Sequence, residues 1–286
     1  MEGKPVCIIG NLGMLGRDLE ESFRAASIET LGLNRRVLDV YHAKETLEKS
    51  IKGSSFVINC LAFTAVDDAE INRQEANFVN GKFPDLLARV CASLSVPLLH
   101  VSSDYVFDGR SREPRSVLHD TDPLTAYGYS KLLGEQALLN HSGDFVIFRT
   151  AWLYGAFGKN FPRTIARKLL DGETVRVVED QCGSPTWTKD LSKLILEYMA
   201  VEERPKIVHA TASGAATWFE FAQEIAASLG LDPDACVKPV PSSEFETLAK
   251  RPKYSVLNNS EGPIAPIGDW RERWRVAAPE VLANLD

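Results

Sequence analysis

Cysteine is scarce in this sequence, and the five cysteines have no spacing that would bind a metal or form a redox pair. They are spread along the chain without a C-x-x-C motif, at Cys7, Cys60, Cys91, Cys182 and Cys236. This excludes a disulfide-stabilised secreted scaffold and a cysteine zinc site. We predict five free thiols.

Long apolar runs and an excess of basic charge are also missing. No apolar run approaches the ~18 residues that span a bilayer, and the first residues enter an apolar segment without the pattern of a secretory signal. The formal net charge of -7 argues against nucleic acid as the main partner. We expect a cytoplasmic protein that has neither a membrane nor nucleic acid as its partner.

The length and composition are those of an ordinary globular protein. The chain has 286 residues, of which 44% are hydrophobic and 25% are charged. This is enough for one large domain, or for a domain with a smaller lobe. The function must therefore be sought in local motifs.

A glycine-rich turn directly follows the first apolar run, Val6-Cys7-Ile8-Ile9, which is typical of a buried parallel strand. Leu15, Leu19 and Phe23 then recur at helical spacing. Strand, glycine turn and helix are the context of a dinucleotide-binding motif, although the spacing is G-x-x-G-x-x-G rather than G-x-G-x-x-G. The helix N-terminus would offer free N–H groups to a pyrophosphate. A plain turn is the alternative. We assign cofactor binding to Gly10, Asn11, Leu12, Gly13, Met14, Leu15 and Gly16.

The end of the second expected strand, 29–33, bears on the choice of cofactor. An acidic residue here would hold the ribose 2′-hydroxyl of NAD, whereas this chain has Asn34, Arg35 and Arg36. Because arginine suits a 2′-phosphate, we predict NADP(H), with NAD(H) left open and two solvated arginines as the alternative. Asp39 and Val40 follow and are placed to reach the adenine edge.

Three further apolar runs, 56–61, 97–101 and 145–149, follow, and two expected helices, 66–73 and 75–94, lie between the first two of them. Alternating strands and helices predict an α/β fold with a doubly wound parallel sheet of the Rossmann type. Residues 1–150 would form the NAD(P)-binding domain, and residues 151–286 would complete the sheet and form a smaller substrate-binding lobe. Small or neutral groups suited to a cofactor wall end the third strand, at Leu61, Ala62 and Phe63.

The second half alternates less regularly. We expect a helix at 161–170, a strand at 174–178 and a helix capped by Thr188. Thr217-x-x-Glu220 and Ser243-x-x-Glu246 predict capping boxes before two more helices. Trp152 and Tyr154 have flat rings that can stack on a sugar or a base. The basic side chains of this half either suit a diphosphate or are merely solvated; they are Lys159, Arg163, Arg167, Lys168, Arg251 and Lys253.

The segment Tyr127-Gly128-Tyr129-Ser130-Lys131 carries the chemistry. It begins a run with Leu132, Leu133, Ala137, Leu138 and Leu139 that predicts an amphipathic helix, with Tyr127 and Lys131 on one face. An ammonium group lowers the pKa of a nearby tyrosine from its usual ~10 and makes it a usable general acid. Ser103 ends the fourth strand, where a hydroxyl can donate to a substrate carbonyl. We assign catalysis to Ser103, Tyr127 and Lys131, with a chance Tyr and Lys on a surface helix as the alternative.

Together these segments resemble the extended short-chain dehydrogenase/reductases, and more narrowly the dTDP-4-dehydrorhamnose reductases and their sugar-reductase relatives. The resemblance covers nearly the whole chain. It rests on Gly10–Gly16, 59–67, 101–109, Tyr127–Lys131, 149–155, 180–186 and Arg251-Pro252. The run from Ser103 to Gly109 is specific to this subgroup, which usually has threonine in place of Ser103.

The resemblance implies NAD(P)H-dependent reduction of the C4 keto group of a nucleotide-linked 4-keto-6-deoxy sugar. Tyr127 would donate the proton, Lys131 would tune it and hold the nicotinamide ribose, and Ser103 would bind the keto oxygen. Asn80 would lie near the active site and contribute to cofactor binding. A homodimer is left open. Substrate binding is implied for Ser103, Asp104, Tyr105, Val106, Phe107, Trp152, Gln181 and Arg251.

One departure concerns a metal. Some family members bind magnesium through carboxylates, and Asp18 matches one ligand, but Lys189 takes the place of another. We therefore expect no metal site.

Two rival functions stay open. The first is another nucleotide-sugar enzyme of the same superfamily, a dehydratase or an epimerase. Dehydratases commonly carry a glutamate after the aspartate that corresponds to Asp104, and because this chain has Tyr105 there, a dehydratase is disfavoured. A non-catalytic regulatory subunit of a methionine adenosyltransferase-like partner would resemble the same reductases. The intact set of Ser103, Tyr127 and Lys131 favours catalysis over that reading.

Overall fold

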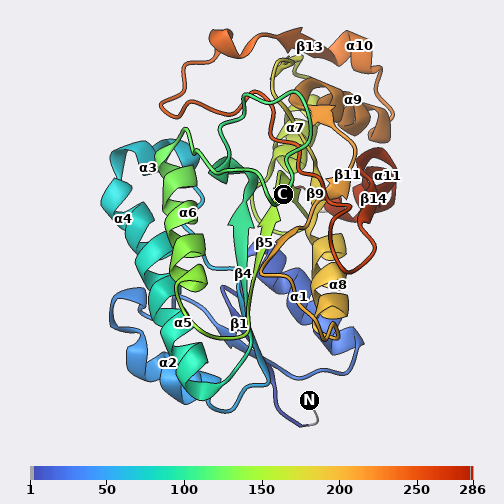
Figure 1. Cartoon of the computed structure of the whole chain (residues 1–286). Helices are drawn as coiled ribbons and strands as arrows, with labels where there is room; N and C mark the ends of the chain where they lie inside the picture. Colours follow the sequence, from blue (N-terminus) through green and yellow to red (C-terminus); the bar gives the residue numbers. More distant parts are fainter. Residues whose placement is uncertain (1–2, 284, 286) are drawn as a thin grey trace.

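A six-stranded parallel sheet forms the centre of the computed structural model, which describes residues 3–283 and 285. The strand order is β10-β5-β4-β3-β1-β2, and every neighbouring pair is parallel (Figure 1). The predicted doubly wound sheet is confirmed. Its strands are β1 (Val6–Ile9), β2 (Thr30–Leu33), β3 (Phe56–Asn59), β4 (Leu98–Ser103), β5 (Phe145–Thr150) and β10 (Ile207–His209).

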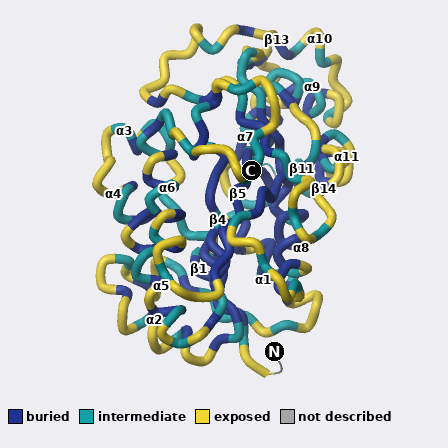
Figure 2. Tube along the Cα trace, in the orientation of Figure 1, coloured by how far each residue is buried: buried dark blue, intermediate teal, exposed yellow. Residues whose placement is uncertain are grey.

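Helices cover both faces of this sheet. One face packs against α1 (Met14–Ala25) and α8 (Thr188–Tyr198), and the other against α2 (Lys44–Ile51), α5 (Phe83–Leu94) and α6 (Ala126–Leu139). Val6 and Ile8 belong to the first core, whereas Cys7 and Ile9 belong to the second. Because both faces are buried, the strands read as continuous apolar runs. Figure 2 shows the strands buried between helices that are exposed on their outer sides.

Apart from α8 and β10, which belong to the sheet and its covering layer, the chain beyond residue 150 builds a lobe over the carboxyl ends of the strands (Figure 1). In it β7 (Val175–Val178) pairs in parallel with β13 (Val237–Val240). The lobe also contains α7 (Phe161–Leu170), α9 (Trp218–Ser228), α10 (Pro233–Cys236) and α11 (Trp270–Val281). Short strands pair as β6 (Leu153–Tyr154) with β9 (Thr186–Trp187), β8 (Cys182–Gly183) with β12 (Ala216–Thr217), and β11 (Ala212–Ser213) with β14 (Ile267–Asp269).

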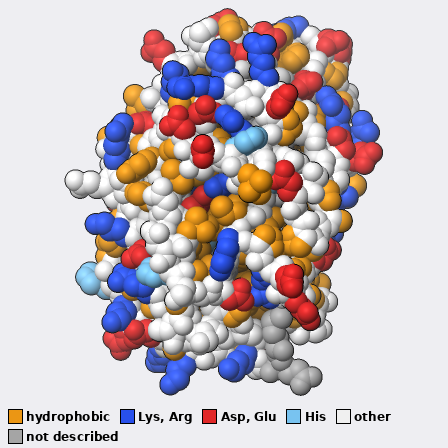
Figure 3. All heavy atoms as spheres, in the orientation of Figure 1, with side chains coloured by type: hydrophobic (Ala, Val, Ile, Leu, Met, Phe, Trp, Pro, Cys, Tyr) orange, Lys and Arg blue, Asp and Glu red, His pale blue; other side chains and the backbone are white. Residues whose placement is uncertain are grey.

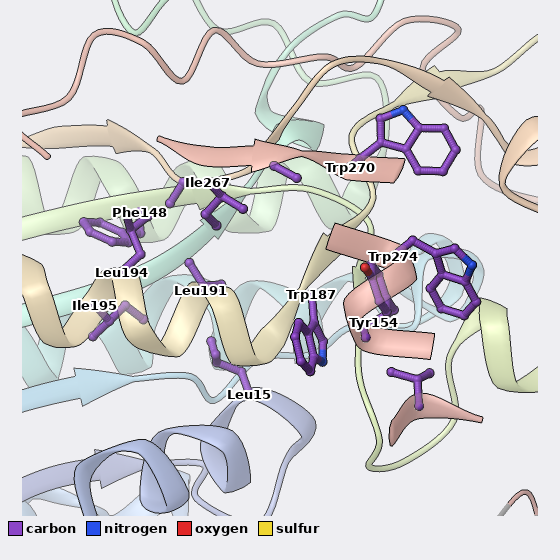
Figure 4. Close-up of a cluster of buried hydrophobic side chains, with 14 of the residues drawn as sticks. Leu15, Phe148, Tyr154, Trp187, Leu191, Leu194, Ile195, Ile267, Trp270 and Trp274 are labelled. Carbon is purple, nitrogen blue, oxygen red and sulfur yellow. The ribbon is translucent and has the colours of Figure 1, made fainter. Parts of the chain in front are cut away.

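A cluster of buried aromatic rings joins the lobe to the sheet (Figure 4). Trp270 and Trp274 of α11 are fully buried, and the Trp274 ring centroid lies 5.5 Å from that of Tyr154. The same cluster includes Phe148 of β5 and Leu191 of α8. Since each aromatic ring buries ~150–250 Å², this contact fixes the lobe on the sheet. Among the helices of the described residues, none has both the length and the apolar composition that a bilayer crossing requires.

The two expected helices at 66–73 and 75–94 are more broken than predicted. They form α3 (Val66–Ile71), α4 (Arg73–Asn77), a π-helical turn η2 (Phe78–Lys82) and α5. The π-helical turn positions Asn80, whose side chain bonds to another segment. A tertiary contact of this kind leaves no periodic signal in the sequence.

Of the three predicted caps, one is confirmed and two are wrong. Thr217 and Glu220 form the capping box of α9. The N-cap of α8 is Trp187, and Thr188 instead donates to the Tyr154 carbonyl oxygen at 3.0 Å. Ser243 lies in a single 3-10 turn, η4 (Ser242–Glu244), that no helix follows before β14. Asp180 accepts bonds from the Ser242 backbone and hydroxyl at 2.8 and 2.9 Å, so tertiary contacts hold this turn.

Candidate active site

The glycine turn after β1 has the backbone of a dinucleotide cradle. Gly10 has a φ of +87°, and a Cβ there would lie 2.9 Å from the Leu61 backbone nitrogen. A Cβ on Gly16 would lie 2.4 Å from the Gly10 carbonyl oxygen. The N-cap of α1, Gly13, provides no side-chain cap, and the first turn holds no acidic residue. The backbone N–H groups of the first turn of α1 are therefore available to an anion, so the residues of the glycine turn fit a pyrophosphate.

The strand order places this turn beside the loop after β3. The chain runs from β1 to β2 on one side and then returns past β1 to β3 on its other side, which makes the β1/β3 boundary the switch point where α/β sheets bind ligands. Leu61, Ala62 and Phe63 follow β3 at this point. The structure thus brings the two predicted cofactor segments together.

The turn after β2 is tied to the glycine turn by side-chain amides. The Asn34 amide donates to Asn11 Oδ1 at 3.0 Å, and the Asn11 amide donates to Glu20 Oε1 at 2.8 Å. Arg35 and Arg36 are exposed on this turn. The exposed Asp39 accepts bonds from the Tyr41 backbone and the His42 ring, which lower the pKa of its carboxyl.

Asn80 lies beneath the loop after β3 and joins it to α6. Its Oδ1 accepts from the Phe63 backbone N–H at 2.8 Å, and its amide donates to the Phe63 carbonyl oxygen and to Ser130 Oγ at 3.0 and 2.9 Å. The side chain is fully buried. Asn80 is therefore placed to position the loop and the helix.

Ser103, Tyr127 and Lys131 gather at the carboxyl end of β4. Thr125 caps α6 through the Gly128 N–H at 2.9 Å and so fixes where the helix begins. The Ser103 hydroxyl lies next to the Tyr127 phenol. The Lys131 ammonium donates to the Val101 carbonyl oxygen at 2.7 Å. The three residues predicted from separate motifs are thus close in space.

The expectation that Lys131 lowers the pKa of Tyr127 is wrong in this structure. Burial raises the pKa of Tyr127 to about 12, with the nearby Asp104 charge also raising it and the Ser103 hydroxyl opposing the shift. Burial also lowers the pKa of Lys131 to about 8, opposed by Glu135 and Cys60. Desolvation sets both directions, because Lys131 is buried and Tyr127 is half-buried. Tyr127 therefore keeps its proton at neutral pH, as a proton donor must.

The buried face of α6 is polar, which the leucine pattern did not predict. Leu139 is 49% exposed, and the buried side includes Lys131 and Glu135. Arg149 of β5 donates three bonds to Glu135, of 2.9, 3.2 and 2.6 Å, and Ser102 donates to Glu135 at 2.6 Å. This buried ion pair fixes the helix against the sheet by directional bonds.

A cavity of about 1230 Å³ opens in the lobe where the segment after Ser103 ends, at Asp108 and Gly109. None of the three catalytic candidates belongs to its lining. Phe161 and Trp218 give it an aromatic wall. Figure 3 shows Lys and Arg side chains interspersed with acidic ones over the lobe. The basic side chains of the lining are Arg110, Arg112, Arg176, Lys250, Arg251 and Lys253.

The predicted substrate residues divide into three groups. Gln181 and Arg251 line the cavity, and Arg251 also pairs with Asp67. The side chains of Val106 and Phe107 are buried in a small cluster with Leu257, and their contact with substrate stays a prediction. Asp104 and Tyr105 lie beside Ser103 and Tyr127, with the rings of Tyr105 and Tyr127 5.4 Å apart.

Trp152 stands apart from these groups because its backbone is left-handed. Its φ is +46°, which is strained for a residue with a side chain. Its ring stacks on Trp218 with centroids 3.4 Å apart and planes 2° apart, and a Cβ on Gly183 would lie 2.3 Å from it. The stack connects Trp152 to the cavity wall through Trp218. Local patterns offered no signal for Trp218 beyond an aromatic residue after the Thr217 cap.

The sequence left two roles open for the α7 cations, diphosphate pairing and solvation, and in the structure three of them have protein partners. Arg163 donates to the carbonyl oxygens of Val281 and Ala283 at 3.0 and 3.2 Å, and Arg167 donates to that of Leu285. Lys168 faces Glu173. This side of α7 binds the end of the chain, because the apolar side faces the lobe.

Asp18 and Lys189 are the positions that correspond to magnesium ligands in some family members. Asp18 lies on α1 and Lys189 on α8. Lys189 donates to Glu280 at 2.6 Å, while both carboxyl oxygens of the buried Asp18 have no hydrogen-bond partner in the structure. Within residues 3–283 and 285, no group of three or more His, Cys, Asp or Glu side chains is arranged to hold a metal. The five cysteines are free thiols.

The fold and the residue pattern are those of an NAD(P)-dependent oxidoreductase of the short-chain dehydrogenase/reductase class. The chain belongs to the family described as the RmlD substrate binding domain, whose sequence model matches residues 4–286.

Three relatives illustrate the family. A probable dTDP-4,6-dihydroxy-2-methyloxan-3-one 4-ketoreductase of Streptomyces antibioticus is 40% identical and covers 96% of this chain and 95% of its own. A dTDP-4-keto-6-deoxy-D-glucose reductase of Streptomyces niveus is 38% identical, and the match covers 98% of this chain and 97% of the relative. The crystal structure of dTDP-4-dehydrorhamnose reductase from Bacillus anthracis in complex with NADP has a TM-score of 0.92 and 30% identity, covering 97% and 99%.

Proposed function

We propose that this protein reduces the C4 keto group of a nucleotide-linked 4-keto-6-deoxy sugar, with NADPH as the hydride donor. The observation that carries the proposal is the position of Ser103 and Tyr127. They meet at the end of β4, where the following segment leads into a cavity with aromatic and basic walls. The names of the relatives, all reductases or ketoreductases of dTDP-linked sugars, support the same activity.

The chain's own residues would hold the cofactor along the β1/β3 switch point. The turn Gly10–Gly16 would bind the pyrophosphate through the free N–H groups of α1. Arg35 and Arg36 would pair with the 2′-phosphate, and Asp39 and Val40 would flank the adenine. Leu61, Ala62 and Phe63 would form the wall that Asn80 supports. We retain NADP(H) as the preferred cofactor.

When bound, NADPH supplies the hydride. Tyr127, protonated at neutral pH, would donate its proton to the keto oxygen as that oxygen gains charge. The Ser103 hydroxyl would donate a hydrogen bond to the same oxygen. Lys131, held by the Val101 carbonyl oxygen, would fix the ribose and add positive charge. General acid catalysis of this kind typically contributes ~10²–10⁴ in rate.

The cavity would bind the nucleotide. A planar base can stack on an aromatic wall such as Trp218, and Arg110, Arg112 or Lys253 can pair with a diphosphate. Contacts so far from the keto carbon can supply binding energy that positions the reacting groups. A sugar without its nucleotide should then lose kcat as well as affinity.

The test is a comparison of NADPH oxidation with a dTDP-4-keto-6-deoxyhexose and with the same sugar lacking the nucleotide. We expect kcat/KM values that differ far more than tenfold. A ratio within about tenfold, ~1.4 kcal/mol, would show that the cavity is not a nucleotide site. Absence of turnover across a panel of nucleotide 4-keto sugars would instead favour a non-catalytic subunit.

We propose residues 1–150 as the cofactor unit and residues 151–286 as the unit that completes the sheet and binds substrate. β10 and the residues of the cavity after position 150 support this division. We also expect a cytoplasmic enzyme whose partner is a nucleotide sugar. Light scattering distinguishes a monomer from the homodimer that the sequence left open.

A further inference from the structure

Asp104 is a buried carboxyl group that none of the steps above uses. It follows β4 directly and opens the 3-10 turn η3 (Asp104–Val106), with a side chain only 2% exposed. The Ser103 hydroxyl lies 2.9 Å from its Oδ1. Its other oxygen, Oδ2, has no hydrogen-bond partner within the part of the chain that the structure describes. A fully buried, unpartnered carboxylate oxygen is costly, whereas a neutral acid avoids much of that cost.

The groups that face Asp104 supply no counter-charge. On α6, Tyr127 is neutral and the Lys131 ammonium is bonded to the Val101 carbonyl oxygen. From the segment after β13, the Ser255 hydroxyl approaches the carboxyl, and it also reaches the Cys182 carbonyl oxygen at 3.4 Å.

The nearest arginine on that segment is also engaged elsewhere. Arg251 pairs with Asp67, with Tyr105 next to it. Among the described residues, no cation forms an ion pair with Asp104. Burial therefore raises the pKa of Asp104 to about 6, opposed by the Ser255 and Ser103 hydroxyls.

The 2.9 Å contact fits a hydrogen bond in either direction, and the direction decides what Ser103 can do. A serine hydroxyl has one proton and two lone pairs. One lone pair accepts the Tyr105 backbone N–H at 3.2 Å. When Asp104 is ionised it can only accept, so the serine proton points at the carboxylate and is lost to any substrate. When Asp104 carries a proton it can donate to the second lone pair, and the serine proton is free.

We propose that Asp104 is a positioning residue that sets the direction of the Ser103 hydroxyl: as a carboxylic acid it turns the serine proton toward the keto oxygen, and as a carboxylate it withdraws that proton. The proposal rests on the reductase function proposed above. Asp104 keeps its own proton throughout, since Tyr127 supplies the proton that the alcohol gains. Its protonation state therefore acts on the strength of oxyanion stabilisation.

The experiment is a pH profile of kcat/KM from pH 5.5 to 7.5 with NADPH and the dTDP-4-keto sugar. For the wild type we expect a fall of roughly tenfold as Asp104 ionises. Asp104→Asn places an uncharged amide donor against Ser103, so it should keep activity at pH 5.5 within a few fold and lose most of the fall. Ser103→Ala should be slower by ~10² and should also lose the fall. Binding of NADPH should not change in either variant.

Asp18→Asn is the matched control, because it removes another buried carboxyl whose pKa burial raises to about 6. It lies between α1 and α8 and should leave the profile of the wild type intact. If Asp104→Asn retains the full fall, or if it is as slow as Ser103→Ala at every pH, the proposal is wrong.

Infrared difference spectroscopy separates this proposal from the proposed function. The carboxylic-acid carbonyl band lost in Asp104→Asn should titrate out of the wild type in the same pH range, whether or not any sugar is turned over. A wild type without activity but with this band would overturn the function and leave the protonated Asp104 in place. Absence of the band at pH 5.5 would overturn the role of Asp104 itself.

Discussion

Replacing Asp18 by asparagine should stabilise the protein, and more so at alkaline than at acidic pH. Asp18 lies on α1 against α8 and is 1% exposed. Among the described residues, neither carboxyl oxygen has a hydrogen-bond partner. The Thr188 hydroxyl lies near the carboxyl but donates to the Tyr154 carbonyl oxygen. Lys189, the nearby cation, is bonded to Glu280. Burial raises the pKa of Asp18 from 3.8 to about 6, with Glu21 and Glu280 adding to the rise and the Thr188 hydroxyl and the Lys189 ammonium opposing it.

The sign and size of the effect follow from proton linkage. A raised carboxyl pKa means that the folded state holds the proton more tightly, so stability is lost as the pH rises from about 4 to about 6. At ~1.4 kcal/mol per pKa unit, the loss reaches about 3 kcal/mol above pH 7 and about half of that at pH 5. Asparagine has nearly the same shape and no charge, so the variant should gain about 2–3 kcal/mol at pH 8 and about half as much at pH 5.

Urea unfolding of the wild type and Asp18→Asn at pH 5 and pH 8 measures this directly, with tryptophan fluorescence as the signal. Asp67→Asn is the control of opposite sign, because the bond from Arg251 lowers the pKa of Asp67. Neutralising Asp67 should reduce stability at pH 8, with a smaller loss at acidic pH. A gain for Asp18→Asn that is equal at both pH values, or a loss at pH 8, would refute the reasoning.

Three further predictions concern the site. Tyr127→Phe should lower kcat by ~10²–10⁴ because it removes the proton donor, while fluorescence titration should still detect NADPH binding. The control Tyr129→Phe, on the exposed side of α6, should keep wild-type turnover. A near-normal kcat in Tyr127→Phe would assign the proton to another group. Replacing both Arg35 and Arg36 by alanine should raise KM for NADPH and leave KM for NADH nearly unchanged, and a wild type that already prefers NADH would contradict it. Trp218→Ala should raise KM for the nucleotide sugar and not for NADPH. Leu248 is an exposed residue of the cavity lining, and Leu248→Ala should change neither KM strongly. If the two variants raise KM for the nucleotide sugar equally, Trp218 does not bind the substrate.

Local sequence patterns predicted much of the fold because they coincide with local structure. The apolar runs became β1 to β5, the glycine turn lies between β1 and α1, and Phe161–Leu170 is a helix as expected. Thr217 and Glu220 cap α9 because a capping box involves only neighbouring residues. The same local reasoning failed at Thr188 and Ser243, whose bonding is decided by Tyr154 and Asp180 from distant parts of the chain.

The basic residues show the same limit. Arg163 and Arg167 carry charges that suit a phosphate, but the fold turns them to backbone carbonyl oxygens near the end of the chain. The lining of the cavity comes instead from Asp108–Arg112, from α7 and β7, and from residues 242–254. No sequence spacing connects these segments, because they meet only through the packing of the lobe.

The sequence by itself determined the sheet, the family and the positions of Ser103, Tyr127 and Lys131, since alternation, glycine turns and one helical turn between Tyr127 and Lys131 are properties of contiguous residues. Tertiary structure alone decided the electrostatics. Burial raised the pKa of Tyr127 where the neighbouring lysine predicted a fall, and it raised the pKa values of the Asp104 and Asp18 carboxyls. The physical reason is that desolvation depends on how many atoms from the whole chain surround a group, which no short stretch of sequence encodes.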